Sequence, residues 1–369
     1  MISVFGSSVG ADELREVQAC LESQWLGHGS RTTTFERRFA ERLGLDDFLL
    51  VDSGSNALYM AVELLELPPG SEIILPSFTW VACAQAVLLA GHRPVFCDVD
   101  LDTQNVTAAT IAAQLTPLTR AVMVVHYAGK PVDMGPVLDL GFPVIEDAAH
   151  AVDSAVQGRA CGSLGDVGIY SFDAVKNLTT GGGGGITARN PALLERGRKL
   201  RYSGIGKSGF EAAQSNGGKR SRWWEYDISE AFIRMLPSDI SAAIGLAQLD
   251  RLDSLQEKRR AVWERYQQAF SNVEWIHTPA DSHPEERHSY FTYFIQVPHR
   301  DELANVLLDK GIYSTLRFHP LHLNGLYGSD KVLPVSETLN RTGLNIPLHP
   351  RLTDEEVQFV IDTILAAPP

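Results

Sequence analysis

The chain has 369 residues, of which 44% are hydrophobic, and a formal net charge of −13. This length and composition provide a full core for two domains, or for one large domain with a smaller lobe. The excess of acidic residues argues against nucleic acid as the main partner, because a phosphate backbone is repelled by the overall field of such a protein, although a local phosphate site is compatible with it.

The N-terminal segment and the cysteines indicate a reducing compartment. Residues 1–6 have neither the basic stretch nor the apolar core of a signal peptide, and no apolar run approaches the length of a membrane span. The cysteines have no CxxC pair and no metal-ligand spacing, and Cys83 and Cys97 lie in apolar stretches typical of reduced, buried thiols. We therefore expect a cytoplasmic protein that is not secreted, enters no membrane and has no metal site.

Short apolar runs typical of strands alternate with helix-like segments over the first half of the chain. This alternation predicts an α/β fold with a largely parallel sheet covered on both faces. Residues 202–221, which are rich in Gly, Ser and Lys, are typical of an exposed loop. The predicted strands are 48–51, 72–75, 95–97, 121–125, 143–145, 167–172 and 185–188.

The second half predicts a linking helix followed by a small α/β lobe. Residues 238–270 have the pattern of one long helix, with Ser238 or Asp239 as its N-cap. Beyond it we expect a strand at 291–297 and helices at 300–310 and 353–366. The expected domains are residues 1–240 and residues 241–369.

The first candidate site along the chain is a turn formed by Gly54, Ser55 and Asn56. It precedes a segment with helical apolar periodicity at 57–65. Free amide groups and the helix dipole at such a turn can bind an anion. A plain helix cap by Ser55 is the alternative.

A second candidate is Asp147, which follows the apolar run 143–145. Open α/β sheets place ligand groups at the carboxyl ends of their strands. Asp147 could cap a helix there, since Ala148 and the residues after it are compatible with one. Alternatively, its carboxylate could face a pyridinium nitrogen, keep the ring protonated and make it an electron sink.

The third candidate is Lys176, which lies between the apolar run 167–172 and five consecutive glycines at 181–185. A lysine at the end of a buried strand loses solvation, so its amine is easier to deprotonate and can attack a carbonyl. A single lysine more often faces solvent, and a glycine run can be a flexible loop. Together, Asp147 and Lys176 fit pyridoxal 5′-phosphate (PLP).

In the order and spacing of its motifs, the chain resembles the DegT/StrS family of PLP-dependent nucleotide-sugar aminotransferases over nearly its whole length. The resemblance implies the type I fold of PLP-dependent aminotransferases, with a large domain around a mostly parallel sheet and a smaller C-terminal α/β domain. It also implies a homodimer with the active site at the subunit interface. The segments that carry it are 53–58, 76–82, 125–134, 146–150, 162–176 and 242–249.

The resemblance also implies residue roles. Lys176 would hold the cofactor as an internal aldimine while Asp147 faces the pyridine nitrogen, and both are the expected catalytic residues. In the family, the turn at 54–56 binds the cofactor phosphate. The cofactor-binding residues expected in this way are Gly54, Ser55, Asn56, Trp80, Asp147, His150, Ser171, Lys176 and Arg234.

Several of these positions also have simpler interpretations. Trp80, expected to stack on the pyridine ring, and His150, expected near the ring hydroxyl, could be ordinary core residues. Ser171 would add a hydroxyl to the phosphate site. Arg234 would reach the phosphate from the other subunit, but a surface arginine before a helix fits as well.

On the small-lobe side, the resemblance places Arg317, His319 and His322 around the substrate, although a simple connection between helix and strand is the alternative. Three residues depart from the family pattern next to the expected sugar site. They are Lys130, where Gln is frequent, Asp173, where His is frequent, and Gly182, where Glu is frequent.

The expected reaction moves an amino group from an amino acid, L-glutamate by resemblance, to a keto sugar nucleotide of the dTDP-4-keto-6-deoxyhexose type through pyridoxamine phosphate. A 3-keto sugar or cyclitol ketone aminotransferase and a non-catalytic PLP-binding regulatory protein remain alternatives. A sugar 3-dehydratase of the same family would carry His in place of the Schiff-base lysine, so Lys176 argues against it.

Overall fold

The computed structural model describes residues 1–206 and 224–367, so most of the predicted loop at 202–221 lies outside the described residues. Its helices are α1 (Ala11–Glu22), α2 (Ser30–Leu43), α3 (Gly54–Leu64), α4 (Val81–Leu89), α5 (Ala108–Ala112), α6 (Met134–Leu138), α7 (Pro191–Arg201), α9 (Asp239–Asp250), α10 (Leu252–Phe270), α11 (Arg300–Asp309), α12 (Pro334–Thr342) and α13 (Asp354–Leu365). Its strands are β1 (Leu49–Val51), β2 (Glu72–Pro76), β3 (Arg93–Cys97), β4 (Thr119–Val125), β5 (Val144–Asp147), β6 (Ala155–Val156), β7 (Arg159–Ala160), β8 (Val167–Ser171), β9 (Gly184–Ala188), β10 (Glu286–Arg287), β11 (Tyr293–Gln296) and β12 (Gly343–Ile346).

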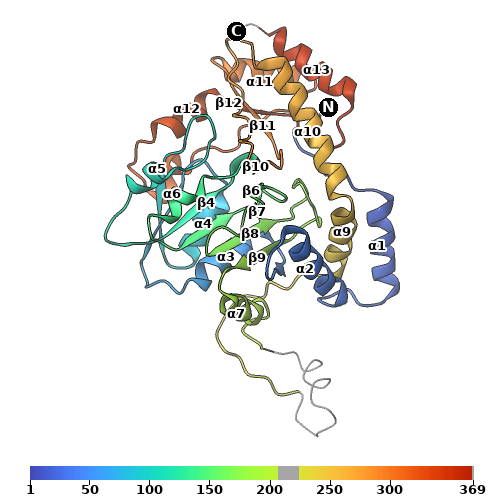
Figure 1. Ribbon diagram of the computed structural model, residues 1–369, viewed down its shortest axis with the longest axis vertical. Coiled ribbons are helices and arrows are strands. Elements are labelled where there is room, and N and C mark those ends of the chain that lie inside the picture. The colour runs from blue at the N-terminus through green and yellow to red at the C-terminus, as the bar shows by residue number, and fades with distance from the viewer. Residues whose placement is uncertain (207–223, 368–369) are drawn as a thin grey trace.

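A seven-stranded sheet with the order β1-β9-β8-β5-β4-β2-β3 forms the centre of the larger lobe (Figure 1). From β8 to β3 all neighbouring strands pair in parallel, whereas β9 runs antiparallel to both β1 and β8. The predicted, mostly parallel sheet is confirmed. The seven predicted strands are all present, with ends within two residues of the predicted ones.

Alternate side chains of the strands bury opposite faces of this sheet. Ile73 and Leu75 of β2 pack into the cluster that includes α3 and α4. Ile74, which lies between them, packs on the other face with residues of α5 and α6. Further along that face, Tyr170 and Phe172 contact α2 and α9. Helices therefore cover both faces, and the strand ends remain as the place for a site.

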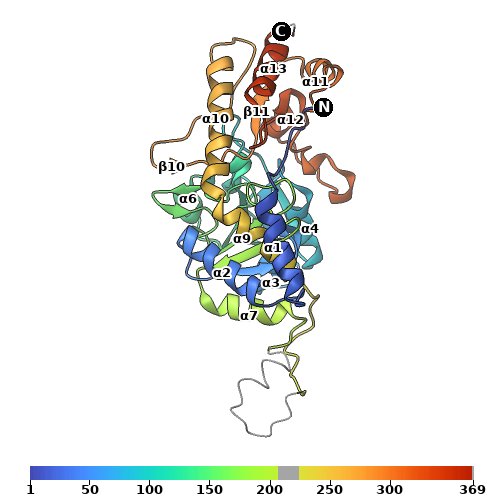
Figure 2. The same ribbon diagram turned by 90° about the vertical axis from the view of Figure 1, so that its right-hand side faces the viewer.

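A smaller lobe forms around the antiparallel pair β11 and β12, with α10, α11 and α13 packed on it. Figures 1 and 2 both place these helices at the opposite end of the molecule from α7. The N-terminal residues also join this lobe, since Ile2 pairs with Ile312. The predicted strand and helices of the C-terminal region are confirmed, and the predicted domain boundary between residues 240 and 241 stays a prediction.

The prediction of one long helix at 238–270 is wrong, because α9 and α10 are separated at Arg251, whose φ of −105° and ψ of 0° are not helical. The Arg251 guanidinium binds Glu13 of α1 at 2.8 Å. The break lets α9 pack on α1 and α2 while α10 packs on α13. Periodicity alone does not detect a break of one residue between two helices. Ser238 is the cap of α9, accepting from the Ser241 amide at 3.1 Å.

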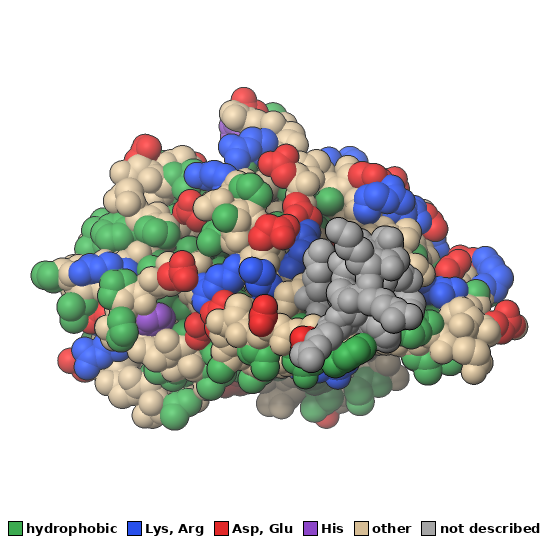
Figure 3. Space-filling view, turned by 90° about the horizontal axis from the view of Figure 1, so that it is seen from below, with side chains coloured by type: hydrophobic (Ala, Val, Ile, Leu, Met, Phe, Trp, Pro, Cys, Tyr) green, Lys and Arg blue, Asp and Glu red, His purple; other side chains and the backbone are tan. Residues whose placement is uncertain are grey.

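The surface carries cationic and anionic side chains side by side, as the view from below shows (Figure 3). On α7, Arg198 forms an ion pair with Asp47 at 2.6 Å, and Arg196 forms one with Glu230 at 2.7 Å. Among the described residues, no helix combines the length and apolar character needed to cross a membrane.

Candidate active site

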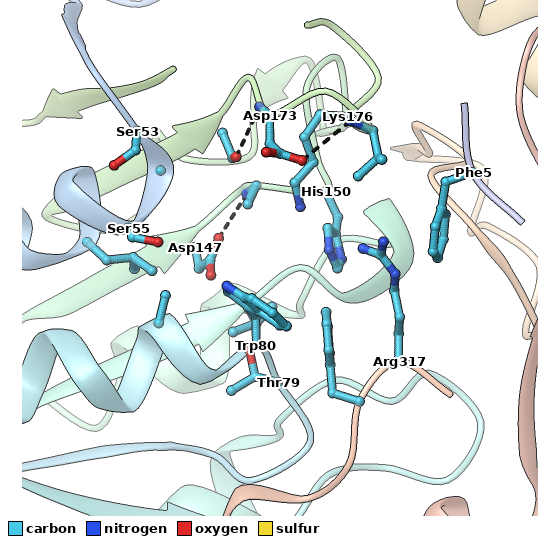
Figure 4. Close-up of a pocket in the computed structure, with 18 of the residues that line it drawn as sticks. Phe5, Ser53, Ser55, Thr79, Trp80, Asp147, His150, Asp173, Lys176 and Arg317 are labelled. Atoms are coloured by element: carbon cyan, nitrogen blue, oxygen red, sulfur yellow. Dashed lines mark hydrogen bonds between the residues drawn. The ribbon is translucent and has the colours of Figure 1, made fainter. Parts of the chain in front are cut away.

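A cavity of about 530 Å³ opens at the carboxyl edge of the parallel strands. Val125, Asp147 and Ser171 are the last residues of β4, β5 and β8, and all three line it. Figure 4 shows Ser55 from the start of α3 on one side of Asp147, and Arg317 with Phe5 on the other. The cavity therefore lies where an open α/β sheet binds its ligand, between the sheet and the small lobe.

One end of the cavity is the first turn of α3. Ser53 caps this helix by accepting from the Asn56 amide at 3.1 Å, so the alternative of a cap by Ser55 does not apply, and Ser55 lines the cavity. A Cβ atom on Gly54 would lie 2.8 Å from the Cβ and hydroxyl oxygen of Ser171, so glycine is needed for this close approach. The first amides of α3 and the Ser171 hydroxyl thus form a cradle suited to an anion.

One of the five glycines helps to build this cradle, and two others line the cavity. A Cβ on Gly184 would lie 2.4 Å from the carbonyl carbon of Ser53, so the start of β9 closes against the turn before α3. Gly182 and Gly183 line the cavity, and Gly181 has a φ of +80°. The run is therefore a strand start and cavity wall as well as a turn.

Asp147 is buried at the end of β5. Its Oδ1 accepts from the Ala149 amide at 2.9 Å, and its Oδ2 accepts from the Cys83 thiol at 3.2 Å. No helix starts directly after Asp147, since the next element is the strand β6, so the alternative of a helix cap does not apply. Trp80, at the N-cap of α4, lies beside the carboxylate with its indole ring towards the cavity (Figure 4).

Lys176 extends into the cavity from the turn after β8, with Nζ 4.8 Å from the centroid of the Phe291 ring. Burial, followed by the positive charge of Arg317, lowers the pKa of Lys176 to about 8, against opposing contributions from Asp147 and Asp173. The unprotonated share of the amine near neutral pH is therefore much larger than that of an ordinary lysine, which favours a nucleophile.

His150 is buried and stacks on Phe291 with ring centroids 4.1 Å apart and planes 17° apart. Burial, and then the charges of Lys176 and Arg317, lower the pKa of His150 well below its ordinary value, so the imidazole is neutral. Its Nδ1 is buried without a hydrogen-bond partner in the described part of the chain. A ligand in the cavity can supply that partner.

The small lobe contributes an aromatic wall with a cation in it. The guanidinium carbon of Arg317 lies 3.5 Å from the centroid of Phe5 and 5.3 Å from that of Phe291. Burial lowers the pKa of Arg317 to about 10, so the group stays charged at neutral pH. Phe318 follows it and contacts Trp80, with ring centroids 5.8 Å apart.

Four predicted site residues lie outside the cavity lining. Asn56 donates to Asp52 at 2.7 Å, and Arg234 is exposed on a segment that pairs with Tyr202. In the small lobe, His319 contacts Asn340 at 3.1 Å, and the buried His322 contacts Ser77 at 2.7 Å. The predicted contacts of these four residues with cofactor or substrate stay predictions.

Of the three residues that depart from the family pattern, two line the cavity and one does not. Asp173 and Gly182 line the cavity. Lys130 does not, because its ammonium forms an ion pair with Glu286 at 3.0 Å and donates to the Asp281 carbonyl at 2.9 Å.

Sequence analysis missed Phe5, Cys83 and Phe291 as neighbours of the site. Cys83 lies within α4 and Asp147 lies at the end of β5, so helical spacing gave no signal of the contact between them. Phe5 and Phe291 are brought to the cavity only by tertiary packing, for which no local pattern exists.

A model of the DegT/DnrJ/EryC1/StrS aminotransferase family matches residues 7–365. The chain belongs to this family. It is 39% identical over 371 residues to the dTDP-4-dehydro-2,3,6-trideoxy-D-glucose 4-aminotransferase of Saccharopolyspora spinosa, with 98% of this chain and 95% of the relative covered. The predicted family is thereby confirmed, and this member of the DegT/DnrJ/EryC1/StrS family is an aminotransferase.

Solved structures agree with this assignment. The aminotransferase TlmJ from Streptoalloteichus hindustanus has a TM-score of 0.92 and 41% identity, covering 99% of this chain and 98% of its own. The PMP-form of the putative sugar aminotransferase Spr1654 from Streptococcus pneumoniae has a TM-score of 0.91 and 27% identity, covering 99% and 98%. The predicted PLP-dependent aminotransferase fold is confirmed.

The family depends on PLP, and the cavity of this family member fits that cofactor. The cradle at Gly54 suits a phosphate, the Asp147 carboxylate suits a pyridine nitrogen, and the Lys176 amine suits an aldehyde. The unpartnered Nδ1 of His150 leaves one buried polar atom for a polar substituent of the ring.

Proposed function

We propose that this aminotransferase moves an amino group from an amino acid, with L-glutamate as the expected donor, to a keto sugar nucleotide of the dTDP-4-keto-6-deoxyhexose type. The observation that carries the proposal is the convergence of Lys176, Asp147 and the first turn of α3 in one cavity. The relative from Saccharopolyspora spinosa, whose name describes a 4-aminotransferase of a dTDP-sugar, supports the substrate class.

PLP, when bound, supplies an aldehyde that combines with amines and a ring that withdraws electrons from the bond that breaks. The protein's part begins with holding it. The amides of Gly54 and Ser55 and the hydroxyl of Ser171 would bind the phosphate. Asp147 would keep the ring nitrogen protonated, and Trp80 would cover one face of the ring.

Lys176 would act twice. Its amine would first bind the cofactor covalently and then, once the donor has displaced it, would move a proton between the α-carbon of the donor and the cofactor carbon that receives the amino group. Its pKa of about 8 allows the amine both to take up and to release a proton near neutral pH.

Arg317 would bind the negative charge of the substrates. Its guanidinium stacks on Phe5 and forms no ion pair with a carboxylate of the described residues, so its hydrogen-bond donors are available on the cavity side. An amino acid brings a carboxylate, and a sugar nucleotide brings a diphosphate. Both suit a planar cation in a partly desolvated wall.

The proposed assembly is a cytoplasmic homodimer in which Arg234 reaches the cofactor phosphate of the other subunit. In its support, Arg234 is exposed and its neighbours Ile228 and Ile233 are 63% and 53% exposed. Ile233 also lines a hollow with Trp80 and Leu89, next to the cavity. Apolar side chains gathered in this way are typical of a surface that another chain covers.

The test follows the absorbance of the protein after reconstitution with PLP. We expect a visible band that L-glutamate bleaches and that a dTDP-4-keto-6-deoxyhexose restores, with formation of the amino sugar. A 3-keto isomer and a cyclitol ketone serve as competing acceptors. If only the 3-keto isomer or only the cyclitol ketone restored the band, that compound would be the acceptor in place of the proposed one. A band that no amino acid bleaches would indicate a PLP-binding protein without transaminase activity.

A further inference from the structure

Helix α4 brings the side chain of Cys83 next to Asp147. Cys83 is completely buried, and its Sγ lies 3.2 Å from Oδ2 of Asp147. The same sulfur lies 3.3 Å from the hydroxyl oxygen of Thr79. A contact chain therefore runs from Thr79 through Cys83 to the carboxylate.

The direction of the hydrogen bond in this chain follows from the groups. Burial, and then the negative charge of Asp147, raise the pKa of Cys83 well above its ordinary value, so the thiol keeps its proton at neutral pH. An ionised carboxylate only accepts, which makes Cys83 the donor to Asp147. The hydroxyl of Thr79 can donate to the sulfur in turn.

This contact fixes the second oxygen of Asp147. The first already accepts from the Ala149 amide at 2.9 Å, so the two donors together determine the plane of the carboxylate. A thiol is a weak donor. It therefore orients Asp147 while withdrawing little of the negative charge that attracts a proton on a ring nitrogen.

We propose that Cys83 is a positioning residue that orients Asp147 and sets how strongly its carboxylate holds the proton of the cofactor ring nitrogen. This inference rests on the proposed role of Asp147 as the partner of that nitrogen. Loss of the donor would let the carboxylate turn and would change the angle and distance at which it meets the ring nitrogen. The electronic state of the bound ring, and with it the pH at which its visible band titrates, would then shift.

The experiment is an absorbance titration of the reconstituted protein against pH, without substrate. In Cys83→Ala and in Cys83→Val, which keeps more of the side-chain volume, we expect the midpoint to move by about 0.5 to 1 pH unit, the size of one lost hydrogen bond. In Cys83→Ser, which keeps a donor, the midpoint should stay closer to that of the wild type. The Ala and Val variants should also lose kcat more than they raise KM.

Cys97→Ala is the matched control, because Cys97 is also completely buried but lies on β3, which β4 and β2 separate from β5 and Asp147. It should leave the midpoint unchanged, and thermal unfolding of all variants reports on the fold. An unshifted midpoint in a folded Ala or Val variant, or an equal shift in the Ser variant, overturns the inference. Absence of a visible band in the wild-type protein would instead contradict the proposed function.

Discussion

The two walls of the cavity are built in different ways. The sheet wall takes Asp147, Ser171 and Lys176 from strand ends and turns that follow one another along the chain. The small-lobe wall joins Phe5 and Arg317 from opposite ends of the sequence. The first presents groups able to react, and the second presents aromatic rings with a cation.

The two walls are coupled by charge. The Phe291 ring lies 4.8 Å from the amine of Lys176 and 5.3 Å from the guanidinium of Arg317. After burial, Arg317 is the largest cause of the lowered pKa of Lys176. We therefore expect substitutions in the sheet wall to abolish catalysis. Substitutions in the small-lobe wall should weaken substrate binding and shift the pKa of Lys176.

The largest effect is expected from Lys176→Ala. Because this side chain supplies both a covalent bond and a proton carrier, turnover should fall by about a thousandfold or more. The visible band of the attached cofactor should be lost while the circular dichroism spectrum is kept. Lys199→Ala, an exposed lysine on α7, is the control. Retained turnover in Lys176→Ala would sink the assignment of this residue.

Asp147→Asn comes next. A neutral amide cannot hold the ring nitrogen protonated, so kcat should fall by about a hundredfold or more, the cost typical of a lost electrostatic contact to the reacting system. Cofactor binding through the α3 turn should persist. Asp139→Asn, at an exposed position after α6, should have no effect. Near wild-type kcat in Asp147→Asn would remove this residue from the site.

Arg317→Gln probes the other wall. Loss of a charged hydrogen bond to an anionic substrate costs about 1.5 to 3 kcal/mol, so KM should rise by about ten- to a hundredfold with a smaller change in kcat. Arg317→Lys should recover only part of this, because an ammonium is not planar and lacks the paired donors. A fall in kcat at unchanged KM would contradict a role of Arg317 in substrate binding. The two walls would then not differ in function as we propose.

The same difference between the walls explains what the sequence could predict. The residues of the sheet wall could be predicted because Asp147 and Lys176 follow apolar runs that indicate strands. The ends of parallel strands meet at one edge of a sheet. In the small-lobe wall, the resemblance led to Arg317, but Phe5 and Phe291 had no local signal. The break at Arg251 was missed as well, since the partner of Arg251, Glu13, lies on another helix far away in the sequence.

A smaller effect is expected at the surface near the cavity. If Arg234 contacts the cofactor phosphate of the other subunit, Arg234→Ala should weaken PLP binding by about tenfold, the cost of one charged contact. Mixed with Lys176→Ala under conditions of subunit exchange, and at a PLP concentration so low that each variant alone is shown to be inactive, it should restore part of the activity, because one complete site is rebuilt. Light scattering tests the dimer itself, and a monomer at working concentration would rule this arrangement out.

The smallest effect concerns the cofactor-free protein and tests the coupling between the walls. Only the neutral amine of Lys176 attacks an aldehyde, so the rate of PLP attachment should rise with pH and level off above about 8, the lowered pKa of Lys176. In Arg317→Gln the inflection should move upward, because one positive neighbour is removed. It should still stay below the ordinary value of 10.5, because burial remains the larger cause. Arg341→Gln, on the exposed side of α12, should leave the inflection where it is.

The lowered pKa of Lys176 has a matching effect on stability. Between about pH 8 and 10.5 the unfolded chain binds more protons at Lys176 than the folded one, so the free energy of unfolding gains from this group as the pH rises through that window. Below pH 8 the cost of burying the ammonium is fully present. Lys176→Met, which cannot carry the charge, should remove this dependence, as denaturant unfolding at several pH values would show. Other groups titrate in the same window, so the difference between wild type and variant is the quantity to compare. An identical pH dependence in both proteins would mean that the pKa of Lys176 is not lowered in the folded protein.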